Sequence, residues 1–166
     1  PEGLQSVPTL AAALQQAKSM TSVSVIELLT NAVIDMTPME IALKQKDLLI
    51  RAGTGFQPIL RFQPVEGNDA FQSNAMIAIR QVRVHWQGIH FNLRFPPKAW
   101  RDSWSLFEIG RIEKLSFDRC VLTIRNLSKD GKSLHNQVSF VSLVHQPTVG
   151  RMGNMAESPP LPIPEI

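Results

Sequence analysis

Residues 75–95 read AMIAIRQVRVHWQGIHFNLRF, and this stretch decides the expected fold. Apolar and polar residues alternate on both sides of Gln87-Gly88, which is the period of a half-buried β-strand. A two-residue turn at Gln87-Gly88 predicts an antiparallel hairpin. Its register buries one complete apolar face, in which the facing pairs are Trp86 with Ile89, Val84 with Phe91, and Val82 with Leu93.

The period of two continues on either side of this hairpin. Residues 119–126 and 134–144 are expected to form a second hairpin, because an odd-length loop at residues 129–131 brings their apolar faces together. The apolar positions of the first hairpin change phase near Arg80-Gln81, where a bulge is expected. Further short strands are expected at 58–62 and within 105–117. Together these strands predict an antiparallel β-sheet or barrel-like body.

The N-terminal third is expected to be helical. Residues 8–19 place apolar side chains at helical spacing, and the buried positions would be Leu10, Ala13, Leu14 and Ala17. Two further segments begin with the Ser/Thr-x-x-Glu pattern of a capping box. These patterns predict helices that begin at Ser24 and at Thr37 and cover residues 24–34 and 38–51.

The last 20 residues have a different composition, rich in proline and poor in bulky side chains. Such a segment favours an extended, polyproline-like arm. Two interpretations stay open: a free tail, or an arm that docks on a neighbouring copy or another subunit. The docking residues would be Pro159, Pro160, Leu161, Pro162 and Ile163. The expected class is α+β, with N-terminal helices in residues 1–54, the antiparallel body in 55–146 and the Pro-rich C-terminal arm in 147–166.

Composition excludes several classes of protein. One cysteine in 166 residues excludes a disulfide scaffold and every zinc module built on several cysteines. No apolar run approaches the roughly 20 residues of a membrane span, so no transmembrane segment is expected. The sequence has no metalloprotease, P-loop, nucleophile-elbow or dinucleotide motif. Cys120 lies on the apolar parity of its strand and is expected to be a small buried hydrophobe. We therefore expect a protein that is not an enzyme, with no cofactor, metal or catalytic residue.

Basic residues form the clearest charge signal. Between Asp69 and Asp102 the chain has no acidic residue, although its net charge is only +3. The basic face comprises Arg80, Arg83, His85, His90, Arg94, Lys98 and Arg101. It suits nucleic acid, an anionic lipid surface or an acidic partner, and ordinary surface charge is the alternative. The hairpin register places His85 opposite His90, but nearby arginines repel a metal ion there.

One short motif carries a family resemblance. Asn126-Leu127-Ser128-Lys129-Asp130-Gly131 has the form Asn-x-Ser-x-x-Gly and follows a predicted strand. It resembles the corresponding element of PilZ domains, which are β-barrels that bind cyclic di-GMP. The resemblance implies guanine and phosphate contacts. The family's second element, Arg-x-x-x-Arg before the barrel, is missing from this sequence.

The favoured function is a non-enzymatic structural or assembly subunit, of the coat, matrix or secretion-scaffold type. Such a subunit would form homo- or hetero-oligomers through its C-terminal arm and contact an anionic partner through the basic face. The alternative is a nucleic-acid or nucleotide-binding module, with cyclic di-GMP as one possible ligand. The sequence assigns no cellular location.

Overall fold

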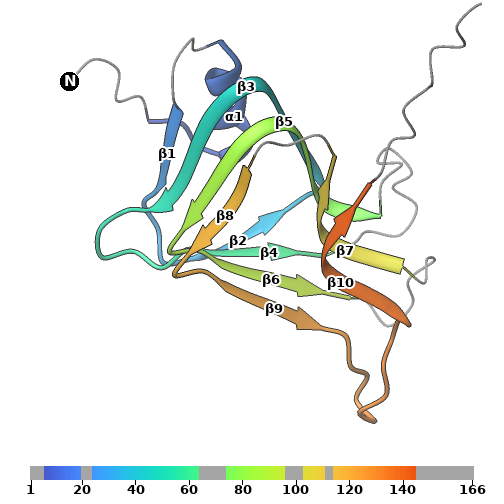
Figure 1. The fold of residues 1–166 in the computed structure, drawn as a ribbon. Coiled ribbons are helices and arrows are strands. Elements are labelled where there is room, and N and C mark those ends of the chain that lie inside the picture. Colours follow the sequence, from blue (N-terminus) through green and yellow to red (C-terminus); the bar gives the residue numbers. More distant parts are fainter. Residues whose placement is uncertain (1–5, 20–23, 64–73, 96–102, 111–113, 145–166) are drawn as a thin grey trace, which may run out of the picture.

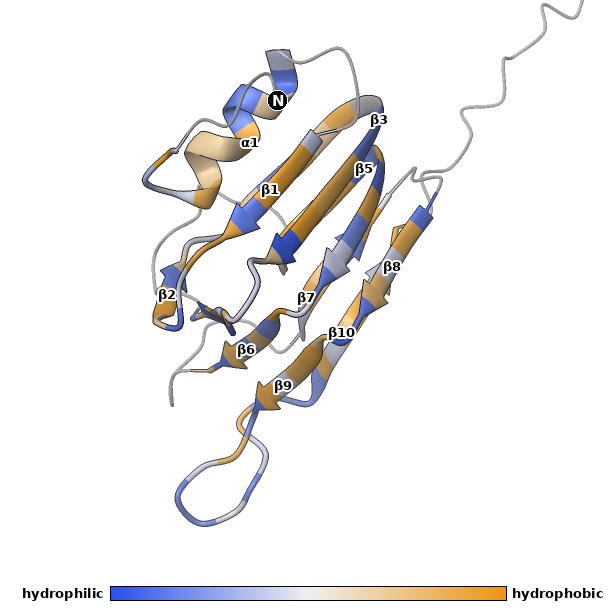
Figure 2. Ribbon diagram, turned by 90° about the vertical axis from the view of Figure 1, so that its left-hand side faces the viewer, coloured by the Kyte–Doolittle hydropathy of each residue, from blue (hydrophilic) through white to orange (hydrophobic). Residues whose placement is uncertain are grey.

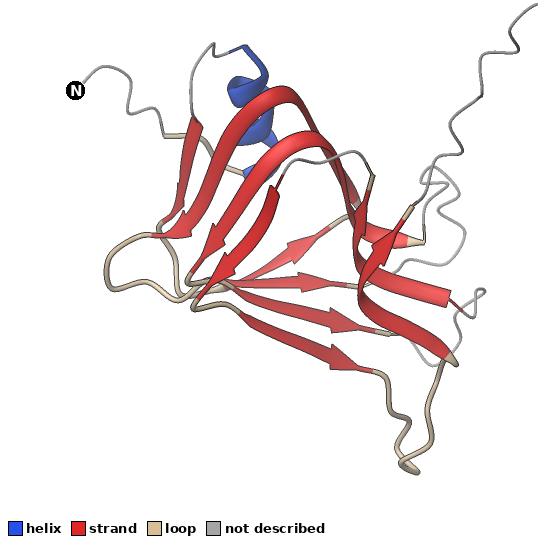
Figure 3. Cartoon of the chain, viewed as in Figure 1, coloured by secondary structure: helices blue, strands red, loops and turns tan. Residues whose placement is uncertain are grey.

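The chain forms a parallel β-solenoid. The computed structural model describes residues 6–19, 24–63, 74–95, 103–110 and 114–144, which contain one helix, α1 (Leu10–Ser19), and ten strands. Figure 1 shows the strands winding around a roughly triangular cross-section, and Figure 3 shows how little of the described chain is helical. The strands are β1 (Ser24–Leu28), β2 (Val33–Met36), β3 (Met39–Ala52), β4 (Ile59–Phe62), β5 (Ala75–Gln87), β6 (His90–Arg94), β7 (Ser103–Ile109), β8 (Lys114–Asp118), β9 (Val121–Arg125) and β10 (Gln137–Leu143).

Two parallel sheets make three walls. The larger sheet has the order β1-β3-β5-β7-β10, with β8 also paired to β5, and the smaller has the order β2-β4-β6-β9. The long strands β3 and β5 bend and pair with each other along both halves. In one wall the first half of β5 also pairs with β7. In the next wall the second half of β3 pairs with β1, and the second half of β5 pairs with β8. Successive coils are therefore β1–β2, β3–β4, β5–β6 and β7–β8–β9, and β10 begins the next one.

Aromatic side chains fill the interior of the solenoid where the three walls meet. Trp86 and Phe117 come from one wall, Phe91 from the second and Phe107 from the third. The ring centroids of Trp86 and Phe91 are 5.0 Å apart, those of Phe91 and Phe107 are 5.2 Å apart, and those of Phe107 and Phe117 are 5.3 Å apart. These edge-to-face and tilted contacts tie all three walls to one core.

Helix α1 closes the first end of this core. Its side chains Leu10, Ala13, Leu14 and Ala17 are buried, so the helix expected over residues 8–19 is confirmed. The Lys46 ammonium donates to the carbonyls of Ala17 and Lys18 at 3.0 and 2.9 Å. It thereby satisfies two of the carbonyl groups that the last turn of a helix leaves unpaired. The helix is thus fixed to the second coil.

The helices expected over residues 24–34 and 38–51 are wrong, because these segments form β1, β2 and β3. The capping-box spacing occurs here without a helix behind it. In β1 the side chains alternate strictly between buried and exposed, and Glu27 pairs across the sheet with Arg51. Contacts with neighbouring coils decide the structure of these segments, and local capping signals do not report such contacts.

The antiparallel sheet is also wrong, because every pairing between the described strands is parallel. β5 and β6 lie in different sheets, and the link between them turns a corner of the solenoid instead of reversing the chain. The same is true of β9 and β10, between which only Leu127 and Ser133 form an antiparallel bridge. The expected phase change at Arg80-Gln81 is confirmed: Gln81 has a φ of 54°, and the register of β3 against β5 shifts there.

Candidate functional site at a corner of the solenoid

Two arginines of the expected basic face are engaged with carboxylates. The Arg80 guanidinium forms an ion pair with Glu108, and the Arg83 guanidinium forms a bidentate pair with Asp47, in which Nη2 donates to Oδ2 at 2.8 Å. The hydrogen bond from Arg83 holds the pKa of Asp47 below its ordinary value. These two cations are therefore largely neutralised within the protein.

The two histidines lie on different walls and do not face each other. The Nδ1 atom of His85 is 2.6 Å from the Ser116 hydroxyl, and the Nε2 atom of His90 is 2.9 Å from the Thr123 hydroxyl. The expected juxtaposition of His85 and His90 depended on the antiparallel register and is wrong. Among the described residues there is no group of three or more side chains suited to hold a metal ion.

The remaining members of the basic face lie apart from these pairs. Arg94 is exposed at the end of β6 and is in register with Arg125 of β9, which is also exposed. Lys98 and Arg101 lie outside the described residues. The structure thus distributes the basic face over different walls. Among the described residues, Arg94 is its exposed member, and Arg125 lies beside it.

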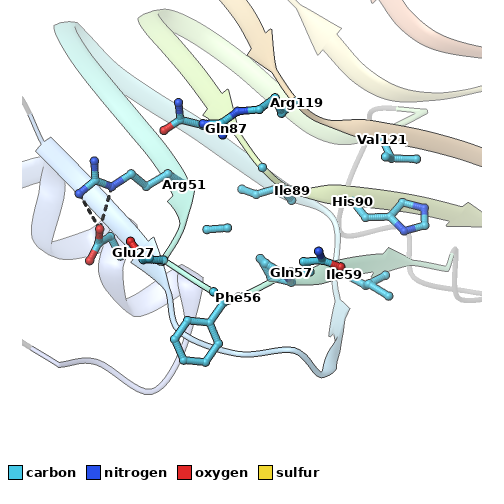
Figure 4. Close-up of a pocket in the computed structure, with 16 residues that line it drawn as sticks. Glu27, Arg51, Phe56, Gln57, Ile59, Gln87, Ile89, His90, Arg119 and Val121 are labelled. Carbon is cyan, nitrogen blue, oxygen red and sulfur yellow. Dashed lines mark hydrogen bonds and ion pairs between the residues drawn. The ribbon is translucent and has the colours of Figure 1, made fainter.

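A groove of about 690 Å³ lies at the corner between the wall of β1, β3, β5 and β8 and the wall of β2, β4, β6 and β9. Figure 4 shows its lining, which comes from four successive coils. We call this feature the corner groove. Its lining consists of Glu27, Arg51, Ala52, Gly53, Thr54, Gly55, Phe56, Gln57, Pro58, Ile59, Gln87, Gly88, Ile89, His90, Arg119 and Val121.

Unequal corner lengths produce the corner groove. In the second coil the corner is the six-residue loop 53–58, which extends beyond the walls in Figure 1. In the third and fourth coils the corner is only two residues long, Gly88-Ile89 and then Arg119-Cys120. The long loop therefore stands as a rim beside the short corners. The Gln57 amide donates to the Asn31 side-chain oxygen at 2.7 Å, which fixes this rim to the first coil.

Two pairs of polar side chains are held in place at the corner groove, and three of these four side chains line it, namely Glu27, Arg51 and Gln87. Nε of Arg51 donates to Oε1 of Glu27 at 2.8 Å, and Nε2 of Gln87 donates to Oδ2 of Asp118 at 2.7 Å. The bond from Gln87 is the main reason that the pKa of Asp118 is lowered. All four residues occupy the same outward column of consecutive strands. The groove thus offers donors and acceptors at fixed positions.

Arg119 is the most exposed charged group of these corners. Its side chain is 75% exposed, and its Nε is 3.3 Å from Oδ2 of Asp118. Its φ of 49° lies in the left-handed region, which costs a residue with a Cβ on the order of 1 kcal/mol. Sequence reasoning missed Arg119, because no signal in the sequence reports a backbone angle or the register between coils.

Cys120 follows Arg119 and is partly buried, whereas the sequence predicted a buried side chain at this position. Its thiol lies 3.5 Å from the carbonyl of Asp118, and burial raises its pKa above the ordinary value. A raised pKa keeps the thiol protonated at neutral pH, so this site does not favour a nucleophilic thiolate.

The segment that resembles the PilZ element forms the expected turn. The Gly131 amide donates to the Ser128 carbonyl at 3.1 Å, and Gly131 has a φ of 74°. However, the turn extends from a parallel solenoid, whereas the resemblance implies a β-barrel of another topology. The barrel implied by the resemblance is therefore wrong.

No protein family, curated protein or solved structure that was compared with the chain matches it. No described helix has both the length and the apolar character needed to cross a membrane.

Proposed function

We propose that the chain is a non-enzymatic assembly subunit that associates through the C-terminal end of its solenoid. This end consists of β8, β9 and β10, the outermost strands of the two sheets. Exposed apolar side chains gather on and beside these strands, and Figure 2 shows apolar stretches along β9 and β10. The exposed residues there are Val121, Phe140, Val141, Leu143 and Val144.

An edge strand is a template for pairing with a strand of another chain. On the outer side of β8, β9 and β10 no described strand takes up the backbone groups. An edge that combines unpaired backbone groups with apolar side chains favours addition of strands from another chain. The opposite end differs, because α1 packs there against β1 and β3 and buries its apolar face.

Contact with an anionic partner is the second part of the proposal. Because Arg80 and Arg83 are paired with carboxylates, the contact rests on Arg94 and Arg125. Like charges opposite each other on neighbouring strands are destabilising, and an anionic group between them removes that repulsion. The alternative of a nucleic-acid or nucleotide-binding module rests on the same two arginines. Loss of salt-dependent polyanion binding in Arg94→Ala and Arg125→Ala would support either version.

The mass in solution tests assembly. Leu143 is 80% exposed and Leu127 is 67% exposed, so Leu143→Asp and Leu127→Asp place the same charge on the edge strand and on the neighbouring loop. We expect light scattering to show an oligomer for the natural chain and for Leu127→Asp, and a monomer for Leu143→Asp. A monomeric natural chain would overturn the proposal, and so would an unchanged oligomer in Leu143→Asp.

The Pro-rich arm needs a test of its own. Its expected docking residues 159–163 lie outside the described residues, so the arm stays a prediction. A chain that ends at Gln146 keeps β10 and removes the arm. If the arm carries the association, this chain is monomeric; if the edge strands alone carry it, the mass per oligomer falls only by the residues removed.

A further inference from the structure

We propose that the corner groove binds an acidic sugar, with Arg119 as the anchor for the sugar carboxylate. The corner groove meets the proposed assembly surface at Val121, the first residue of β9, and the proposal depends on Arg119, which precedes that strand. Three features of the groove support this assignment: the backbone of Arg119, the balance of charges and the fixed polar side chains.

The backbone of Arg119 is the first argument. Gly88 and Arg119 hold the same place in two-residue corners of successive coils, between the register pairs Gln87–Asp118 and His90–Val121. Both have a positive φ, which glycine adopts without strain and arginine does not. Strained backbone angles of this kind cluster at functional sites. Arg119 therefore has a backbone angle that glycine would adopt with less strain. The fold does not require an arginine at this position, so we look to the guanidinium for a function.

The charge balance of the corner groove is the second argument. Arg51 is neutralised by Glu27 at 2.6 Å. Among the described residues, Arg119 pairs only with the Asp118 carboxylate, at 3.3 Å, and that oxygen already accepts a shorter bond from Gln87. One guanidinium in the groove is thus available to an anionic group. Arginine pairs well with a carboxylate, because its planar fork can donate two parallel bonds.

The remaining lining favours a ligand rich in hydroxyl groups. A hydroxyl both donates and accepts, and the groove presents guanidinium and amide donors beside carboxylate and amide acceptors. These come from Arg51, Gln57 and Gln87, with Glu27 as the carboxylate, and several are held by bonds between coils. Ile59 and Val121 add apolar surface in the same groove. This mixture suits the polar rim and apolar faces of a sugar ring.

Size and charge argue against a nucleic acid in this groove. A nucleic acid needs several unpaired cations along its backbone and aromatic surfaces for its bases. The corner groove provides one available guanidinium and two aromatic rings, the Phe56 ring and the smaller imidazole of His90. Its volume of about 690 Å³ is that of a small-molecule site.

Titration calorimetry and amide NMR on the full chain test this proposal. The probes are a disaccharide of galacturonate, the matching neutral disaccharide of galactose, and inorganic phosphate. We expect the acidic disaccharide to bind, more weakly at high salt, and to shift the amide signals of Gln87, His90 and Arg119. The neutral disaccharide and phosphate should each bind at least about tenfold more weakly.

The decisive variant is Arg119→Gly, because glycine accepts the same backbone angle and the corner keeps its shape. We expect affinity for the acidic disaccharide to fall about tenfold or more. Lys132→Ala removes an exposed cation from the loop after β9 and should bind as the natural chain does. Unchanged affinity in Arg119→Gly overturns the proposal. Equal binding of the neutral disaccharide or of phosphate overturns it as well, since the site then recognises the sugar or the anion alone.

Discussion

Gly88 and Arg119 stack on each other at one corner of the solenoid, and both have left-handed backbones, with φ values of 67° and 49°. The Gly88 amide donates to the carbonyl of Asp118 at 2.9 Å, so the two corners are also joined by a backbone bond. One corner has the residue type that this geometry favours and the other does not. Exchanging the residue types therefore separates the requirements of the fold from those of the corner groove.

Gly88→Ala is expected to lower the free energy of unfolding by about 1–2 kcal/mol. The added Cβ requires a strained φ and lies 3.3 Å from Cβ of Ala52. Gly55→Ala is the matched control, because Gly55 has a φ of 81° and no atom within 4 Å of an added Cβ. Urea denaturation of both variants separates strain from crowding. A Gly88→Ala variant as stable as the natural chain would contradict the argument.

Arg119→Gly is expected to leave the free energy of unfolding unchanged or to raise it by up to about 1 kcal/mol. Relief of the backbone strain opposes the larger freedom of glycine in the unfolded chain, and the two effects are similar in size. The same urea titrations measure it. A fall in the free energy of unfolding of more than about 1 kcal/mol would show that the Arg119 side chain stabilises the corner. The arginine would then be explained by the stability of the fold and not by a ligand.

The sequence predicts the core of this fold better than its topology. Alternation correctly placed Trp86, Ile89 and Phe91 in the interior, where each is at most 1% exposed. It could not say which strand pairs with which, because a two-residue corner and a hairpin turn have the same length. The partners of β5 come from far along the chain, and unequal loops between the coils hide the repeat.

The candidate site was less predictable than the core. The prediction of a basic face assumed that residues close in sequence are also close in space. His85 and His90 instead lie on different walls, because the chain turns a corner between them. Conversely, Glu27, Arg51 and Gln87 become neighbours only when coils stack in register. Sequence patterns within one strand carry no information about that register.

The aromatic core supplies a third stability prediction. Phe91→Ala is expected to lower the free energy of unfolding by about 3–5 kcal/mol, because Phe91 is fully buried and contacts rings from both other walls. Phe140→Ala is the control, since Phe140 is 39% exposed at the edge of the solenoid. Phe140→Ala should lower the free energy of unfolding of the monomer much less than Phe91→Ala does. Thermal or urea unfolding that ranks the two variants equally would contradict this description of the core.

Acid should destabilise the protein through its cross-strand ion pairs. Hydrogen bonds from Arg83 and Arg61 hold the pKa values of Asp47 and Asp35 below the ordinary value of 3.8. The unfolded chain therefore takes up protons at a higher pH than the folded chain does. The two ionised carboxylates therefore stabilise the folded chain fully above about pH 4, and this contribution is lost as the pH falls through their lowered pKa values.

Urea midpoints measured between pH 6 and pH 3 test this sign. Asp47→Asn removes one pair and should make the midpoint less dependent on pH over this range. Asp130→Asn changes an exposed residue of the turn after β9 and should reproduce the fall seen in the natural chain. A midpoint that rises toward pH 3, or an equal fall in Asp47→Asn, would contradict the assigned role of the pair.

Cys120 provides a chemical measurement at the corner itself. It is the single cysteine of the chain, and burial is the main reason that its pKa is raised. Because the thiolate is the reactive form, iodoacetamide at pH 8 should modify Cys120 several-fold more slowly in the folded chain than in urea. N-acetylcysteine in the same two solvents corrects for the effect of urea on the reagent. Folded-state labelling as fast as that of the free thiol would show that the corner leaves this thiol open to solvent and unprotected.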